Sequence, residues 1–284
     1  MTYSFPDSPE FLRLLQGDPR ADLTRIALEI ARDARPGLEF APWLRRLDDL
    51  AARARLRVSN EAPTLAVLHQ INWVLYVEEG FSGNEEDYFD PSNSYLNEVL
   101  ERRTGIPISM GLVYRAVAER LGLSLHGVNL PAHFVLRADH APAGPIFIDP
   151  FHGGRLLDRD ACRELIASRI GRPVELADEQ FLPMTPAAIV ARMLRNLRAI
   201  HLQGGEAAPA FHVLRRLAAL EPGEGEHRRD LGIVALGIDR LEDGIEQLSA
   251  YLEQDGQAAD AGRIRSLILD ARHRQAEGGD PEAD

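Results

Sequence analysis

The sequence has 284 residues and a formal net charge of −12, with 45% hydrophobic and 27% charged residues. This composition is ordinary for a soluble globular protein, and the length suffices for one large domain or two of ordinary size. The negative charge argues against a general nucleic-acid binder, which needs a basic face to neutralise phosphates. Only 6% of the residues are aromatic, so the core must consist mostly of Leu, Ala, Val and Ile.

Cysteine usage and the N-terminal sequence bear on the compartment. The single cysteine, Cys162, excludes an internal disulfide framework and a Cys-rich zinc site, and it suits a reducing cytosol. The start, MTYSFPDSPEFLRLLQ, has no basic segment followed by an apolar run, so it does not predict a signal peptide. No stretch approaches the roughly 18 consecutive apolar residues that a membrane span needs. We therefore expect a cytoplasmic protein with no membrane contact.

Residues 1–57 predict helices whose role is packing. Ser8-Pro9 is a helix-start signal, and Asp22 can cap a helix that ends at Pro36-Gly37. The apolar residues of that helix recur at helical spacing, which indicates one buried face. They are Leu23, Ile26, Ala27, Ile30 and Ala31.

Residues 61–80 predict another helix, followed by the acidic loop GFSGNEEDYFDPSNS. The loop does not have the spacing of an EF-hand, which needs acids at alternate positions, a central Gly and a terminal Glu. We therefore interpret it as a solvated loop that ends in a helix cap near Ser92 to Ser94.

Residues 93–157 are the stretch in which we expect a site. Helices are predicted at 94–103 and 107–121, because Gly105 breaks the chain and Pro107 suits the first position of a helix. Gly122 is a typical residue just after a helix end.

Three strand-like segments follow, at Leu125–Leu130, His133–Asp139 and Pro145–Asp149. The short link HAPAG joins the last two as a hairpin. If the hairpin turns near Ala141, His133 lies directly opposite Asp149. Cross-strand partners are close enough for an aspartate to orient an imidazole. The sequence therefore predicts a His133–Asp149 pair.

The C-terminal part has a repeating pattern. After a helix at 158–169, apolar residues of 197–217 recur 34 residues later, which is the period of tetratricopeptide helix pairs. Two such pairs and a terminal helix at 259–272 are predicted. The polar end QAEGGDPEAD predicts disorder.

Residues 93–157 also carry ordered motifs: R-x-G-x-P-I-S, P-x-H-F and I-D-P-F-x-G-G. With the N-terminal helices, these motifs resemble the bacterial SirB-type family, in which a transglutaminase-like domain precedes tetratricopeptide repeats. The resemblance covers nearly the whole chain. It implies an α+β, papain/transglutaminase-like core with N-terminal helices, followed by an all-α region. The expected domains are 1–180 (core 61–170) and 186–274, with a disordered tail at 275–284.

The resemblance also implies site residues. In transglutaminase-like enzymes a cysteine begins the helix that ends in Leu-Gly, and its thiolate attacks an acyl carbon. That position holds Pro107, whereas His133 and Asp149 match the histidine and the orienting aspartate. Ser109 lies about 200° around the helix from the expected direction. The candidate binding residues in the motifs are Asn97, Ser109, Phe151, Gly153 and Gly154.

Alternatives for the pair and for the cysteine stay open. The pair could be a retained structural strut, or it could form a metal site with His152 and His126, although we expect no metal and no cofactor. Cys162 is expected to be an inert, partly buried thiol.

Three functions fit the sequence. The first is a non-catalytic transglutaminase-like protein that binds a protein or peptide, with the repeats as a second surface. The second is a hydrolase or acyltransferase that uses His133 and Asp149 without the usual cysteine. The third is a regulatory protein that acts through its repeats alone. The sequence does not define an oligomeric state.

Overall fold

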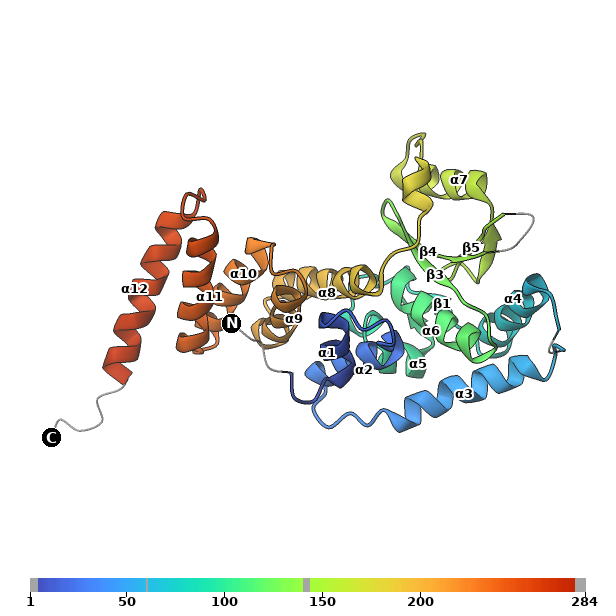
Figure 1. Cartoon of the computed structure of the whole chain (residues 1–284), viewed down its shortest axis with the longest axis horizontal. Coiled ribbons are helices and arrows are strands. Elements are labelled where there is room, and N and C mark those ends of the chain that lie inside the picture. The colour runs from blue at the N-terminus through green and yellow to red at the C-terminus, as the bar shows by residue number, and fades with distance from the viewer. Residues whose placement is uncertain (1–4, 60, 140–143, 279–284) are drawn as a thin grey trace. The chain divides into compact units, whose positions relative to one another are not determined.

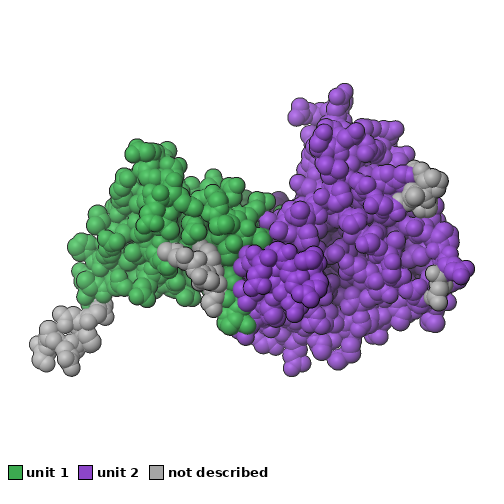
Figure 2. Space-filling view, in the orientation of Figure 1, with its two compact units in different colours: residues 1–6, 194–284 green, residues 7–193 purple. Residues whose placement is uncertain are grey.

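The computed structural model describes residues 5–59, 61–139 and 144–278. The chain forms two compact units, shown in purple and green in Figure 2. The larger unit is Asp7–Met193, and the smaller unit comprises Leu194–Asp284 together with Met1–Pro6. The division falls within α8 (Pro186–Gln203), beyond the predicted domain limit at residue 180, which stays a prediction.

The larger unit contains helices and short strands, and its C-terminal limit lies inside α8. Its helices are α1 Pro9–Leu15, α2 Leu23–Ala34, α3 Ala41–Arg55, α4 Thr64–Asn72, η1 Trp73–Glu78, η2 Pro91–Asn93, α5 Leu96–Arg102, α6 Pro107–Arg120, α7 Arg159–Ile170 and η3 Asp178–Phe181. Its strands are β1 Ser82–Gly83, β2 Thr104–Gly105, β3 His126–Leu130, β4 His133–Ala138, β5 Ile146–Asp149 and β6 Arg155–Leu157. Together they confirm the predicted α+β class.

The four strands β3 to β6 form an antiparallel sheet in chain order, with α6 and α7 on opposite sides (Figure 1). On one face, Val135 and Phe147 pack with Cys162 of α7 in a buried apolar cluster. On the other face, Phe134 packs so closely on α6 that a Cβ at Gly111 would lie 2.6 Å from its ring. The glycine therefore permits the close contact between α6 and the sheet.

The register of the hairpin differs from the predicted one. Leu136 pairs with Ile148, which is two residues away from the pairing that would set His133 directly opposite Asp149. In the ladder His133 instead pairs with Leu130 of β3. The predicted turn at residues 140–143 lies outside the described residues. A shift of two residues keeps each side chain on its face, so His133 and Asp149 remain diagonal neighbours.

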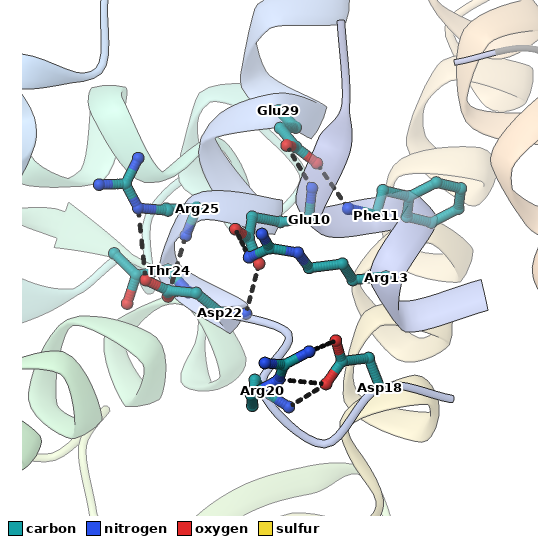
Figure 3. Close-up of polar contacts among 9 residues, drawn as sticks. All are labelled: Glu10, Phe11, Arg13, Asp18, Arg20, Asp22, Thr24, Arg25 and Glu29. Carbon is teal, nitrogen blue, oxygen red and sulfur yellow. Dashed lines mark hydrogen bonds and ion pairs between the residues drawn. The ribbon is translucent and has the colours of Figure 1, made fainter. Parts of the chain in front are cut away.

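Buried carboxylates join the N-terminal helices. Asp22 caps α2 as predicted, because its side chain accepts the N–H groups of Thr24 and Arg25. Ser8 makes no capping bond to α1. Instead, Glu29 of α2 reaches across and accepts the N–H groups of Glu10 and Phe11 at 3.0 and 2.8 Å (Figure 3). The first backbone N–H groups of α1 therefore find their acceptor in a buried side chain of α2 and not in the N-cap residue.

The helix predicted over 61–80 changes type halfway. It is α-helical to Asn72 and then a π-helix, in which Glu79 donates its N–H to Val74. The buried carboxylate of Glu79 pairs with Arg46 and Arg53 of α3 and so fixes the end of this segment. A π-helical turn changes the direction in which side chains point, and such turns are common at functional sites.

The smaller unit is entirely helical in its described part. After the end of α8 it contains α9 Ala207–Leu220, α10 Gly225–Gly237, α11 Leu241–Gln254 and α12 Ala261–Gly278. α9 and α11 begin 34 residues apart, in agreement with the predicted repeat. Helix α12 continues to Gly278, so residues 275–278, which were predicted to be disordered, are helical. The rest of that predicted tail, 279–284, lies outside the described residues.

No helix in the described parts of the chain is both long and apolar enough to cross a membrane.

Two glycines allow α10 and α11 to approach closely. A Cβ at Gly232 would lie 2.6 Å from Leu248 and 3.1 Å from the carbonyl oxygen of Gly244. Because backbone cannot move aside, we expect Gly232→Ala to lower the free energy of unfolding by about 1–3 kcal/mol, as overpacking does. Gly237→Ala is the control, since a Cβ there meets nothing within 4 Å. We expect it to be neutral or stabilising by up to about 1 kcal/mol.

Urea unfolding followed by circular dichroism measures both variants. A Gly232→Ala protein as stable as the Gly237→Ala protein would show that the helices are not in close contact at this point.

Candidate functional site

The candidate site lies where β4 begins and β5 ends. The two strands are antiparallel neighbours, so the start of one lies beside the end of the other, at the same end of the sheet. His133 is the first residue of β4 and Asp149 is the last residue of β5, and both are 0% exposed. His133 Nε2 lies 2.9 Å from Asp149 Oδ1, which is a hydrogen-bond distance. The structure therefore brings together the two residues of the predicted pair.

Asp149 binds more than His133. Its Oδ1 also accepts the backbone N–H of Phe151 at 3.1 Å, and its Oδ2 lies 2.6 Å from Nδ1 of His152. Burial by itself raises the pKa of Asp149, but the hydrogen bonds and charges of His133 and His152 outweigh it and leave the pKa below its ordinary value. Asp149 is therefore a buried carboxylate held ionised between two imidazoles.

His152 is a member of the site that sequence reasoning named only as part of a metal alternative. Its side chain is 36% exposed, and its Nε2 lies 3.8 Å from the carboxylate of Glu85 in the acidic loop. The only sequence signal was its position in the I-D-P-F-x-G-G motif, at the variable place. His152 is therefore the residue through which the site is exposed to solvent.

His133 is closed from solvent on its other side. Its Nδ1 is buried and has no hydrogen-bond partner among the described residues. The ring of Phe151 meets the imidazole edge-on, with ring centroids 6.3 Å apart. Phe151 is itself packed on Gly83, where a Cβ would lie 2.5 Å from the phenyl ring. The cover over His133 therefore depends on a glycine in β1.

The loop after Asp149 is held by side chains of α4 and the π-helix. Asn72 donates to the carbonyl oxygen of Gly154 at 2.8 Å, and Tyr76 donates to that of Pro150 at 2.9 Å. Gly154 has φ +70°, and a Cβ there would lie 2.0 Å from Asn72 Oδ1. Gly154 is thus required by geometry, and we find no ligand role for it. The one sequence signal for Asn72 is that it is polar while its neighbours at helical spacing, Leu68 and Leu75, are apolar.

The other residues predicted for the site are not part of the His133–Asp149 pair. Gly153 is exposed in a left-handed turn, with φ +71°. Asn97 lies on α5 and lines a different cavity, together with residues of α2. Ser109 is buried, and its hydroxyl accepts the N–H of Ile106 at 3.1 Å and donates to the carbonyl oxygen of Asn93 at 2.5 Å. Ser109 therefore closes the start of α6.

Pro107 begins α6 and is buried. By strand alternation, His133 and Asp149 share the face of Val135 and Phe147, which carries α7, whereas α6 covers the opposite face. The strand ends could still bring the two together, and the idea that Pro107 occupies the place of a nucleophile stays a prediction.

Cys162 lies on the same face as the pair. It is fully buried in the cluster formed with α7, which is more than the predicted partial burial. Burial, and then the negative charge of Asp149, raise the pKa of its thiol to about 12. The thiol is therefore protonated at neutral pH and is a poor nucleophile.

His133, Asp149 and His152 are the one group of potential metal ligands found among the described residues, with one ligand atom of each lying within 4.8 Å of the others. Histidine and carboxylate are suitable ligands for zinc or iron. The ligand atoms that face one another already form hydrogen bonds: His133 Nε2 lies 2.9 Å from Asp149 Oδ1, and His152 Nδ1 lies 2.6 Å from Asp149 Oδ2. His126, the fourth residue of the predicted alternative, does not belong to this group.

The role of Asp149 in the fold can be tested by pH. Because its folded pKa lies below the value of about 3.9 in the unfolded chain, Asp149 stabilises the fold above that pH, and this stabilisation is lost as the pH falls through the folded pKa. We expect Asp149→Asn to lower the free energy of unfolding by about 3 kcal/mol at pH 7, and the difference from the parent to shrink below about pH 4.

Asp139→Asn is the control, since Asp139 is exposed and, among the described residues, forms a surface ion pair with Arg137. Its effect should be under about 1 kcal/mol. Equal losses for the two variants in urea unfolding at pH 7 would contradict a structural role for Asp149.

Comparisons with known proteins agree with the architecture. Residues 41–195 match the family described as "Transglutaminase-like superfamily", and residues 197–268 match "Tetratricopeptide repeat". A UPF0162 protein of Xylella fastidiosa is 32% identical over 256 residues, which are 89% of this chain and 91% of that protein. A UPF0162 protein of Pseudomonas aeruginosa is 33% identical over 227 residues, which are 78% of this chain and 80% of that protein.

F-box only protein 21 of Mus musculus is 44% identical over 111 residues, which are 37% of this chain and 18% of that protein. No solved structure matches the chain. The matches to both family descriptions confirm the predicted combination of a transglutaminase-like core and a helical repeat region. The chain belongs to the transglutaminase-like superfamily and to the family of UPF0162 proteins, and it carries a tetratricopeptide repeat region.

Proposed function

We propose that the chain is a non-catalytic transglutaminase-like protein that binds a protein or peptide partner, with the tetratricopeptide repeats as its main binding surface. The observation that carries the proposal is the complete burial of His133. A general base must reach its substrate within hydrogen-bond distance, whereas His133 is 0% exposed and has the ring of Phe151 edge-on to its imidazole.

The available nucleophiles support the same proposal. Position 107 holds a proline, which has no nucleophilic side chain, and Ser109 is engaged with backbone groups. Cys162 is buried and protonated at neutral pH. Covalent acyl transfer needs an activated nucleophile beside a base, and none of these three residues meets that requirement.

The repeats support a binding role. Tetratricopeptide units stack helix pairs into extended surfaces that suit protein partners. A regulatory role, a cytoplasmic location and the SirB-type relationship belong to this proposal, in keeping with the single cysteine and the order of the motifs. We propose no membrane or nucleic-acid partner.

The alternative function, a hydrolase or acyltransferase, has one observation in its favour. His133 is fixed at Nε2 by Asp149 while its Nδ1 is unpaired among the described residues, as in an oriented general base. For this nitrogen to act on a substrate, the groups that bury it would have to move.

Turnover separates the two functions. We expect the parent protein to show no hydrolysis of amide or ester substrates above the uncatalysed rate, and His133→Ala to leave that rate unchanged while lowering the thermal midpoint. The lower midpoint follows because the variant leaves the buried carboxylate of Asp149 without one of its partners. Turnover in the parent that is lost in a folded His133→Ala protein would establish the enzyme.

Binding through the repeats can be tested on the full chain. Partners captured on the immobilised protein are identified by mass spectrometry, and the purified partner is titrated by calorimetry. We expect a charge exchange at a cavity of the smaller unit, Arg228→Glu with Glu253→Lys, to weaken binding by about tenfold or more.

The matched control exchanges a surface ion pair of the larger unit, Asp18→Lys with Arg20→Glu, and keeps the same net charge. It should leave the affinity unchanged. If the control exchange weakens binding and the repeat exchange does not, the repeats are not the main binding surface.

A further inference from the structure

The smaller unit holds an aromatic side chain from the segment that precedes α1. Residues Met1–Pro6 belong to the same compact unit as Leu194–Asp284, although α1 itself belongs to the larger unit. In the described part of this segment, Phe5 is only 7% exposed. Phe5 lies outside every helix and strand and is followed by a proline, which favours an extended backbone. An extended residue is thus seated on a helical surface.

Two consecutive arginines of α9 contact the ring of Phe5. The guanidinium carbons of Arg215 and Arg216 lie 5.4 and 5.2 Å from the centroid of this ring. Both distances are within the range of a cation–π interaction. The guanidinium of Arg215 also lies 5.7 Å from the centroid of Phe211, one helical turn earlier on the same face. Phe5 is therefore held by the electrostatics of its ring as well as by its burial.

The chemistry around Phe5 is that of a recognition surface. Arg216 is 1% exposed and is among the largest fully buried side chains of the described residues. Removing a guanidinium from water is unfavourable, and an apolar side chain would cover Phe5 without this cost. A guanidinium instead distinguishes an aromatic ring from an aliphatic side chain of similar size. Arginine and aromatic residues are also the side chains that dominate the binding energy of protein interfaces.

We propose that Phe211, Arg215 and Arg216 of α9 form a binding site for an aromatic side chain of an extended segment of a partner protein, and that Phe5 is the resident competitor in this aromatic site. The proposal rests on the binding role proposed for the repeats and names the chemistry of the partner. The partner's ring takes the place of Phe5, so the buried guanidinium becomes accessible when Phe5 leaves.

Phe5 regulates the site because it is part of the same chain. A ligand joined by a short flexible link competes at an effective concentration that is roughly millimolar. The apparent affinity for a partner is reduced in proportion to the fraction of molecules in which the site is free. Removing the ring of Phe5 should therefore open the site to an aromatic peptide added in solution.

The experiment titrates the ¹⁵N-labelled full-length protein with the peptide Ac-Ser-Phe-Pro-Asp-Ser-NH₂, which has the sequence of residues 4–8, and follows the backbone amides of α9 by NMR. We expect saturable shifts in Phe5→Ala, with an affinity about tenfold or more above that of the parent protein. Phe89→Ala is the matched control, since Phe89 is 67% exposed, and it should bind the peptide as the parent does.

Two further comparisons test the role of the ring and of the guanidinium. A peptide with pentafluorophenylalanine keeps the shape of the ring but removes the negative face that attracts a cation, so it should bind several-fold more weakly. In the Phe5→Ala background, Arg215→Ala should weaken binding of the parent peptide several-fold. Arg263→Ala is its control, since Arg263 is exposed on α12, and it should have no effect.

Thermal midpoints check that the variants are folded. If Phe5→Ala unfolds, Phe5→Leu decides, because it keeps an apolar side chain without a ring and should still bind the peptide several-fold more tightly than the parent. Equal affinities of the parent and the folded Phe5 variant, no saturable shift in that variant, or equal binding of the fluorinated peptide would overturn the proposal. If the peptide fails while the Arg228→Glu, Glu253→Lys exchange still weakens binding of a captured partner, the proposed function stands without the aromatic site.

Discussion

The carboxylate of Asp149 accepts hydrogen bonds from buried backbone at the end of β5 and lies between the imidazoles of His133 and His152. A buried carboxylate stays ionised only when such partners offset the loss of water, and here they lower its pKa despite burial. The same contacts fix the orientation of both rings and the turn that follows the strand. The geometry of the site therefore depends on this one charged group.

The surroundings of Asp149 close the site. Asn72 and Tyr76 hold the backbone of the following turn, and Phe151 covers His133 while resting on Gly83. Gly83 leaves no room for a Cβ beside Phe151, and the amide of Asn72 both donates to Gly154 and accepts from Tyr114. The sequence resemblance predicts that His133 and Asp149 are the paired histidine and aspartate of a transglutaminase-like core, and in the structure solvent does not reach either side chain. The burial of the pair and the presence of a repeat region are what support the proposal of a binding protein.

The sequence predicted the large features because they rest on local signals. Helix periodicity, the Asp22 cap and the 34-residue repeat are all patterns between residues near one another in the chain. They correctly predicted helix α2 and the helix pairs of the C-terminal region. The His133–Asp149 contact was predicted for a reason that was wrong in detail. The register is shifted by two residues, and the contact survived only because such a shift keeps the face of the sheet.

Other parts depend on contacts between distant segments, which one sequence does not reveal. Glu29 caps a helix that precedes it by many residues, and Tyr76 of the π-helix donates to the carbonyl oxygen of Pro150. The proximity of Cys162 to the charge of Asp149 arises from the packing of α7 on the sheet. The exclusion of Asn97 from the site likewise follows from tertiary packing.

The closed state of His133 is the central claim, and hydrogen–deuterium exchange at the imidazole C2 position tests it most directly. Mass spectrometry of peptides resolves His133 from His152, which provides an exposed internal reference next to the same carboxylate. Exchange at His133 should be much slower than at His152. Exchange at His133 as fast as at His152 would show that solvent reaches the buried ring, and it would contradict the account of a closed, non-catalytic site.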